Sequence, residues 1–274
     1  MFWYMNINET SLNDWITQRV LRGKYFFSIN DIEESFTQKT HNYLRTDLNR
    51  LTKRGVIMSP CRNFYVAVPE EYRLKGVVPP VLYIDNMMSF MGKPYYVALL
   101  SAAALHGAAH QAPQAFMVIT NDKMRSVVKN GTRWDFVTRK YIPTAFLIKK
   151  RSKSGDFNVS SPALTAIDLI EYEANVGGLS RATEVLAELL ETIDFKSVDD
   201  DFYKIAQTPI YQRLGYILEE VLDEKAQADT LYDGCKNAGL TFRKTPLKKG
   251  RVAEQESATR WKIQENITLE IDEL

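Results

Sequence analysis

Six polar side chains recur at helical spacing between residues 39 and 53, and their types suit contact with a nucleic acid. Steps of about 100° per residue place them opposite an apolar stripe of Leu44, Leu48 and Leu51. None of the six is an acid, whereas most exposed helix faces mix acids with bases. Cations contact phosphates, and Asn, Thr and Arg hydrogen-bond base edges, so this face favours DNA binding over a merely solvated surface. The six are Lys39, Asn42, Thr46, Asn49, Arg50 and Lys53.

The elements that must position this face follow the order of a winged helix-turn-helix domain. Ser11 begins a first helix that Gly23 can end, and Ser28 repeats the capping pattern after a short apolar strand at 25–27. The helix with the polar face is expected over about 39–54 and ends at Arg54-Gly55. Apolar runs at 56–58 and 64–68, joined by a turn through 59–63, predict a two-stranded hairpin.

In a winged helix the third helix enters the major groove with its N-terminal residues nearest the bases. His41 is expected on the inward side of this helix as a packing residue, and Arg62 at the hairpin tip is the expected wing contact. The expected base-edge contacts are Lys39, Asn42, Arg45 and Thr46. The expected phosphate contacts are Asn49, Arg50 and Lys53.

A connector rich in Pro and Gly follows the hairpin, which predicts a domain boundary near residue 75. Residues 1–75 would form the DNA-binding domain and residues 76–274 a larger mixed α/β domain, so the expected fold class is α+β. In the second domain an apolar, buried helix is expected to open at Lys93-Pro94 and run through Leu105. Strands are expected at 115–120, 134–138, 261–263 and 267–269, and helices at 162–174, 180–192, 199–207, 209–223 and 227–237.

Motifs for catalysis or cofactor binding are missing from the second domain. It contains no GxxxxGK[ST], GxGxxG or GxSxG. His106 and His110 stand four residues apart, but Gly107 interrupts the helix and no HExxH base accompanies them. Acids in this domain, such as Asp168, are expected to be solvated or to serve helix dipoles. We therefore expect no enzyme activity, no metal and no cofactor.

Composition and cysteine usage favour a cytoplasmic protein. Hydrophobic residues make up 45% of the chain, and the net charge is +1. Cys61 and Cys235 lie far apart without CxxC spacing, which predicts neither a disulfide framework nor a zinc site. Residues 1–5 are apolar but lack the basic region and longer apolar run of a signal peptide, and no window suits a membrane span.

Two basic clusters fall in segments expected to be loops. Solvated loops and secondary contacts with DNA or an acidic partner explain such clusters equally well. The candidate residues are Lys149, Lys150 and Arg151 in the first cluster, and Lys248, Lys249 and Arg251 in the second.

Several apolar stretches of the second domain carry a family resemblance: residues 95–107, 114–120, 161–170, 212–219 and 260–263. Through them the chain resembles AbiEi antitoxins of type IV toxin-antitoxin, or abortive-infection, systems. The resemblance implies a bacterial phage-defence protein whose winged helix represses its own operon. It also implies a second domain that neutralises a co-encoded nucleotidyltransferase-like toxin, with direct contact and indirect antagonism both open. The expected operators are inverted repeats in promoter DNA, with two copies of the chain on each.

Two alternatives stay open at this point. One is a transcriptional regulator that senses a small ligand in a pocket lined by the helix around Tyr95 and Leu105. The other is a metal-dependent nuclease or nucleotide-modifying enzyme, with Asp135, Asp168 and Glu171 as metal ligands. The missing motifs favour the binding protein over both.

Overall fold

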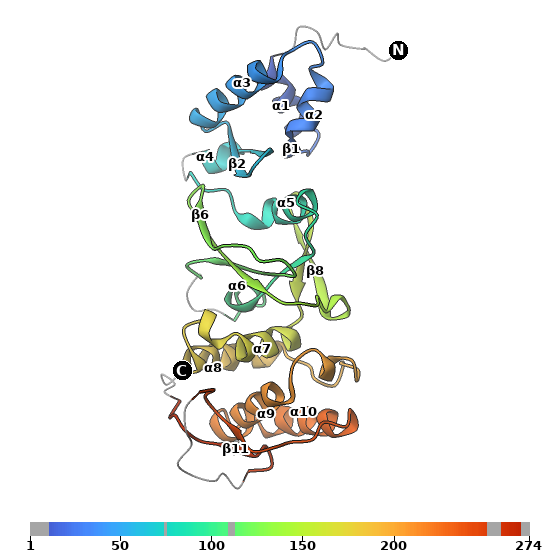
Figure 1. Ribbon diagram of the computed structural model, residues 1–274, viewed down its shortest axis with the longest axis vertical. Helices are drawn as coiled ribbons and strands as arrows, with labels where there is room; N and C mark the ends of the chain where they lie inside the picture. The colour runs from blue at the N-terminus through green and yellow to red at the C-terminus, as the bar shows by residue number, and fades with distance from the viewer. Residues whose placement is uncertain (1–10, 74–75, 109–112, 251–258, 270–274) are drawn as a thin grey trace. The chain divides into compact units, whose positions relative to one another are not determined.

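A computed structural model describes residues 11–73, 76–108, 113–250 and 259–269. The fold is mixed α+β, as the sequence predicts (Figure 1). It divides into two compact units. Unit 1 contains the described residues within Met1–Tyr95, Thr120–Lys140 and Lys149–Asn158. Unit 2 contains those within Tyr96–Ile119, Tyr141–Ile148 and Val159–Leu274. The domain boundary near residue 75 stays a prediction.

The N-terminal part of unit 1 contains each helix and strand that the sequence predicts there. The helices are α1 (Leu12–Leu21), α2 (Ile29–Ser35) and α3 (His41–Lys53). The strands are β1 (Phe26–Ser28), β2 (Ile57–Cys61) and β3 (Phe64–Ala67), which form an antiparallel sheet of order β1-β3-β2.

Local hydrogen bonds explain where these helices begin and end. The Ser28 hydroxyl accepts from the Asp31 N–H at 3.1 Å, and the Asp31 carboxylate accepts from the Ser28 N–H at 2.7 Å. This is the reciprocal capping box expected at the start of α2. Gly23 and Gly55 follow α1 and α3 with φ of +75° and +68°, a left-handed conformation that glycine adopts without a steric penalty.

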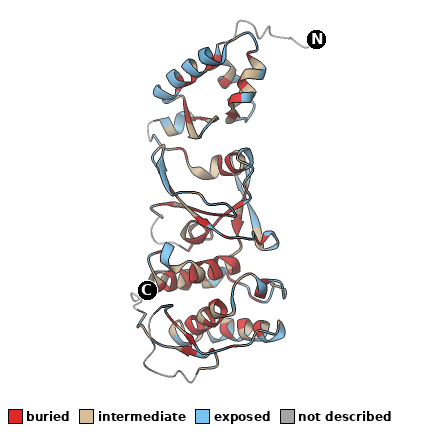
Figure 2. Cartoon of the chain, viewed as in Figure 1, coloured by how far each residue is buried: buried red, intermediate tan, exposed pale blue. Residues whose placement is uncertain are grey.

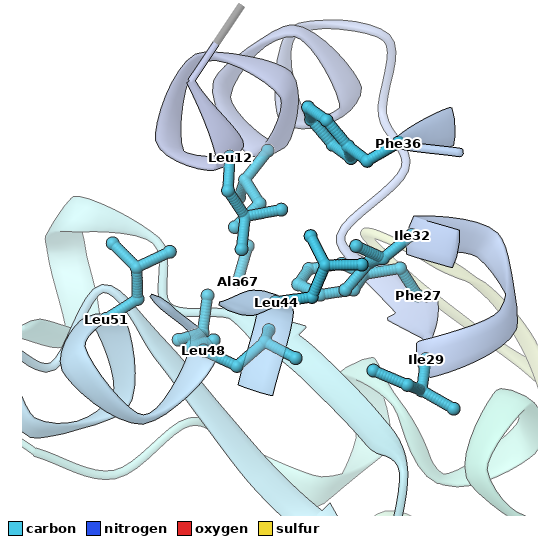
Figure 3. Close-up of a cluster of buried hydrophobic side chains, with 11 residues drawn as sticks. Leu12, Phe27, Ile29, Ile32, Phe36, Leu44, Leu48, Leu51 and Ala67 are labelled. Atoms are coloured by element: carbon cyan, nitrogen blue, oxygen red, sulfur yellow. The ribbon is translucent and has the colours of Figure 1, made fainter. Parts of the chain in front are cut away.

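One apolar core holds these elements together (Figure 3). Leu44, Leu48 and Leu51 of α3 are each about 1% exposed and belong to the same buried cluster as Phe27 and Ile32. The apolar stripe predicted from the 3.6-residue period therefore faces the core, and the opposite side of α3 faces solvent.

A six-stranded sheet has the order β6-β7-β5-β4-β9-β8. Strands β6 and β7 pair antiparallel, and β4 and β9 pair parallel. The strands are β4 (Tyr95–Val97), β5 (Phe116–Thr120), β6 (Val127–Lys129), β7 (Thr132–Thr138), β8 (Leu147–Ser152) and β9 (Gly155–Ser160). Two short helices in unit 1 are α4 (Glu70–Arg73) and α5 (Ile84–Phe90).

Unit 2 is mainly helical, and most residues of α7, α8 and α9 are buried (Figure 2). They are α6 (Leu99–Leu105), α7 (Pro162–Glu171), α8 (Leu179–Leu189), α9 (Thr208–Tyr216) and α10 (Lys225–Asn237). The chain continues from α9 into a π-helical turn, Ile217–Val221, and two short strands, β10 (Thr245–Pro246) and β11 (Ile263–Gln264), pair in parallel. The predicted helices at 162–174, 180–192, 209–223 and 227–237 are thereby confirmed in existence, with ends shifted by a few residues.

Three predicted elements of the second domain are wrong. The helix expected from Lys93-Pro94 begins only at Leu99, because residues 95–97 form β4, in which Val97 pairs with Val159. The segment 199–207, where a helix is expected, contains only a 3-10 turn at Phe202–Lys204. The strand expected at 267–269 is absent, since the last described strand is β11.

In the described part of the chain, no helix is long and apolar enough to cross a membrane.

Candidate nucleic-acid interface

The outward side of α3 presents the polar residues that the sequence singles out. Asn42, Arg45, Thr46, Asn49, Arg50 and Lys53 are all exposed. Figure 2 shows this side of α3 as an exposed surface in the N-terminal part of the chain. Because the three leucines of the same helix are buried, the backbone of α3 is fixed while its polar side chains stay available for a partner.

The start of α3 differs from the sequence expectation. The N-cap is Thr40, whose hydroxyl accepts from the Tyr43 N–H at 3.3 Å, so Lys39 precedes the helix and is half-buried. The Lys39 ammonium lies 4.7 Å from the ring centre of Phe36 and 5.2 Å from that of Tyr43. These cation–π contacts hold its charge beside the N-terminus of α3.

Tyr43 is a candidate contact that the sequence reasoning missed. Its side chain is 52% exposed, although large aromatic rings usually bury most of their surface. The available signal was its spacing, since position 43 lies three residues before Thr46 and so shares a side of the helix with it.

The inward orientation expected for His41 is wrong. Its side chain is 49% exposed, and its Nδ1 pairs with the Glu33 carboxylate of α2. Position 41 lies at the edge of the apolar stripe rather than within it, and a carboxylate on the neighbouring helix draws the ring outward. The pair links the two helices that flank the turn.

An acid lies at the border of the polar face. The Asp47 carboxylate is 3.2 Å from an Arg50 guanidinium nitrogen, one helical turn away. The pair partly neutralises Arg50, whereas in the described part of the chain no ion pair involves Arg45 or Lys53. The Thr46 hydroxyl donates to the Asn42 carbonyl at 2.9 Å, which leaves its lone pairs free to accept.

The hairpin after α3 turns more tightly than expected. Strand β2 extends to Cys61, so the turn contains only Arg62 and Asn63, and Asn63 adopts a φ of 63°. Arg62 is exposed at the tip, as predicted. Burial raises the pKa of Tyr65 on β3, and the charge of Arg45 opposes this shift, which places Arg45 near the hairpin.

The two basic clusters are in different environments. Lys149, Lys150 and Arg151 lie on strand β8 rather than in a loop, with Lys149 and Arg151 exposed. In the second cluster Lys249 is exposed, but the Lys248 ammonium is 2.7 Å from the Glu173 carboxylate and half-buried. Arg251 lies outside the described residues.

The acids considered as metal ligands in the sequence do not lie in a metal-binding arrangement. Asp168 of α7 is 0% exposed, so its expected solvation is wrong, and Asp135 lies 3.3 Å from Arg133. The His106 ring lies 2.8 Å from the Ser160 carbonyl oxygen, and His110 is outside the described residues. In the part of the chain that the structure describes, no three His, Cys, Asp or Glu side chains form a group that could hold a metal ion.

The fold is that of an α+β protein, and the helix α3 presents an exposed polar side with few acids. The family model of the AbiEi antitoxin C-terminal domain matches residues 96–220. The protein therefore carries a domain of the AbiEi antitoxin family, and the family resemblance is confirmed. This region contains most of β4, the strands β5 to β9 and the helices α6 to α9.

The fold is also similar to that in the crystal structure of the RV2827C protein from Mycobacterium tuberculosis. The TM-score is 0.64 with 14% sequence identity, and the similarity covers 93% of this chain and 92% of that chain. At this identity the similarity concerns the fold alone. No curated protein matches the chain.

Proposed function

We propose that this protein is the antitoxin of a type IV toxin-antitoxin, or abortive-infection, system and represses its own operon. It binds promoter DNA through a winged helix-turn-helix formed by α1 to β3, and its second domain neutralises a co-encoded nucleotidyltransferase-like toxin. The AbiEi domain over residues 96–220 carries the antitoxin half of the proposal. The exposed, acid-poor side of α3 carries the DNA half.

In the proposed complex α3 lies in the major groove with its N-terminal turns against the bases. Asn42 and Arg45 reach base edges, because an amide and a guanidinium can each make bidentate hydrogen bonds there. Thr46 accepts through its hydroxyl. Lys39, held beside the start of α3, contacts base edges or the phosphate next to them.

Phosphate contacts come from the second half of α3 and from the wing. Asn49, Arg50 and Lys53 lie along the C-terminal half of the helix, and Arg62 lies at the tip of the hairpin. We expect Lys53 to contribute more to phosphate binding than Arg50, because Asp47 already pairs with Arg50. Two copies of the chain on an inverted repeat would double these contacts and cover the promoter.

Fluorescence anisotropy with the operon's own promoter DNA tests the DNA half. Wild-type protein should bind this DNA more tightly than a scrambled duplex. Arg45→Ala should reduce that preference by about 1–3 kcal/mol, roughly 5- to 150-fold, if Arg45 makes a bidentate base contact. Lys204→Ala, which removes an exposed cation from unit 2, is the matched control and should leave the preference unchanged. Equal binding of both duplexes by the wild type would refute the proposed repressor.

Co-expression with the neighbouring toxin gene tests the antitoxin half. The wild-type protein should restore growth, and Arg45→Ala should restore it equally when the toxin is transcribed from an independent promoter. This separation is expected because α3 lies outside the AbiEi domain. Failure of the folded wild-type protein to restore growth would contradict the antitoxin assignment.

A further inference from the structure

A second basic hairpin lies in unit 1, outside the elements assigned to DNA so far. It is formed by β6 and β7 and by the segment leading into β6. We call residues 123–133, which end within the first residues of β7, the ribbon arm. The register pairs Val128 with Arg133 and Lys129 with Thr132, and the turn is Asn130-Gly131. Both turn residues have positive φ, 50° and 75°, as a two-residue hairpin turn of this kind requires.

The ribbon arm is exposed on both of its faces. Successive strand residues point to opposite sides, and in β6 all three residues are exposed, including Val128 at 72%. Strand β6 is also the edge of its sheet. A hairpin with neither face buried contributes little to a core. Its side chains are therefore available for contact with a partner.

All charged side chains of the ribbon arm are positive. Residues 123–134 contain no acid and four exposed cations: Lys123, Arg125, Lys129 and Arg133. Of the acids that flank the arm, Asp135 pairs with Arg133, and Asp122 pairs with Lys93. No ion pair involves Lys123, Arg125 or Lys129 within the described residues.

One packing contact and one electrostatic effect connect the arm with the N-terminal part of unit 1. At the tip, a Cβ added to Gly131 would lie 2.5 Å from a methyl carbon of Val77, so the turn packs directly against the segment that follows α4. Burial raises the pKa of the Cys61 thiol at the end of β2, and the positive charge of Lys129 opposes this increase. The charge of Lys129 therefore acts on the end of β2.

The base of the arm is also held firmly. Trp134, 3% exposed, packs against Tyr83 with ring centres 5.9 Å apart and stacks on Phe136 at 5.9 Å. Held at its tip and at its base, the arm presents its cations from a defined position. A defined position lowers the entropy lost when a partner binds.

We propose that the ribbon arm is a second DNA contact, in which Lys123, Arg125 and Lys129 bind phosphates next to the site that α3 reads. The inference rests on the proposed DNA-binding function and extends it. Because the β2–β3 turn has only two residues, the wing itself contributes a single exposed arginine at its tip. The neighbouring arm supplies the cations that this short wing lacks, and DNA is the polyanion already expected at that surface.

The arm's contribution is distinguishable from that of α3 by its dependence on salt and sequence. Phosphate contacts carry no sequence information, and each one changes the slope of log K against log salt by about 0.9. The triple variant Lys123→Ala, Arg125→Ala, Lys129→Ala should therefore weaken binding to promoter and scrambled DNA by the same factor. Its salt slope should fall by about 2 to 3 relative to the wild type.

The matched control is the triple variant Lys196→Ala, Lys204→Ala, Lys225→Ala, which removes the same charge from exposed positions of unit 2. It should change the salt slope by less than half of the value of about 0.9 expected for one phosphate contact. The single variant Lys129→Arg keeps the charge and should bind as the wild type does. Circular dichroism melts of all variants check that these exposed substitutions leave the fold intact.

The outcomes separate this inference from the function on which it rests. If Arg45→Ala removes sequence preference but the arm variant keeps the wild-type salt slope, the second contact is refuted while the repressor stands. If the arm variant binds DNA normally but loses toxin neutralisation, the arm is a protein contact and the inference is overturned. If the wild type binds no promoter DNA, the proposed function itself fails.

Discussion

Helices α3 and α7 show how differently the two units use residues of similar type. In α3 three of thirteen residues are buried, and its polar side chains face solvent. In α7 eight of ten residues are buried, among them Thr165 and Asp168. Polar residues of this protein are therefore available to a partner only where the helix that carries them lies at the edge of a core.

This contrast also explains why the family match identifies no contact residue in the antitoxin domain. The stretches that carry the resemblance include α7 and the part of α9 that packs on Trp261. Buried residues of this kind are constrained by packing rather than by contact with a partner. The antitoxin surface is therefore to be sought outside these buried helices.

The largest expected effect is on unit 2. Trp261 is 0% exposed, it donates from its indole N–H to Glu219 at 2.6 Å, and its ring fills the space above Gly215. Trp261→Ala should lower the free energy of unfolding by about 3–5 kcal/mol, measured by urea denaturation. Tyr141→Ala, at a position 75% exposed, should change it by less than about 0.5 kcal/mol. A loss below about 1 kcal/mol for Trp261→Ala would show that this core is not closely packed.

Neighbouring residues of α3 should give opposite results. Leu48→Ala should destabilise the protein by about 2–5 kcal/mol, because Leu48 is 1% exposed in the N-terminal core. Asn49→Ala should leave stability within about 0.5 kcal/mol but weaken binding to promoter DNA. Urea unfolding and anisotropy on both variants check this. Equal effects of the two substitutions on stability would break the division of α3 into a core side and a binding side.

The capping box of α2 has a smaller expected effect. Ser28→Ala removes the acceptor for the Asp31 N–H and should lower stability by about 1 kcal/mol, seen as a lower melting temperature. Thr17→Ala, on an exposed turn of α1, is the control, since its hydroxyl bonds only to a carbonyl of its own helix. An unchanged melting temperature for Ser28→Ala would mean that tertiary contacts alone hold the start of α2.

The smallest expected effect distinguishes two cations of the same helix. Lys53→Ala should reduce the salt slope of DNA binding by about 0.9, the value for one phosphate contact. Arg50→Ala should reduce it less, because Asp47 already pairs with Arg50 in the free protein. Anisotropy titrations over a range of salt concentrations measure both. Equal slopes for the two variants would show that the Asp47 pair opens on binding.

The N-terminal elements and the outward side of α3 were predictable from the sequence. Capping by Ser11 and Ser28, the leucine spacing of α3 and the glycines after the helices all act within a few residues, so a local pattern contains the information. The sequence alone also shows that the catalytic motifs are missing from the second domain and that the chain resembles the AbiEi family. The helices predicted from long apolar periods, such as α7 and α10, are confirmed for the same reason.

Which side chains contact one another depends on how the elements pack. Residues 95–97 became a strand because Val97 pairs with Val159, and His41 turned outward toward Glu33 on another helix. Asp168 became a buried residue because neighbouring helices cover α7. The turn at Gly131 came to pack against Val77, which lies more than fifty residues earlier in the chain. Each of these contacts joins different secondary-structure elements, and the energies of such contacts are not encoded in the local pattern of either element.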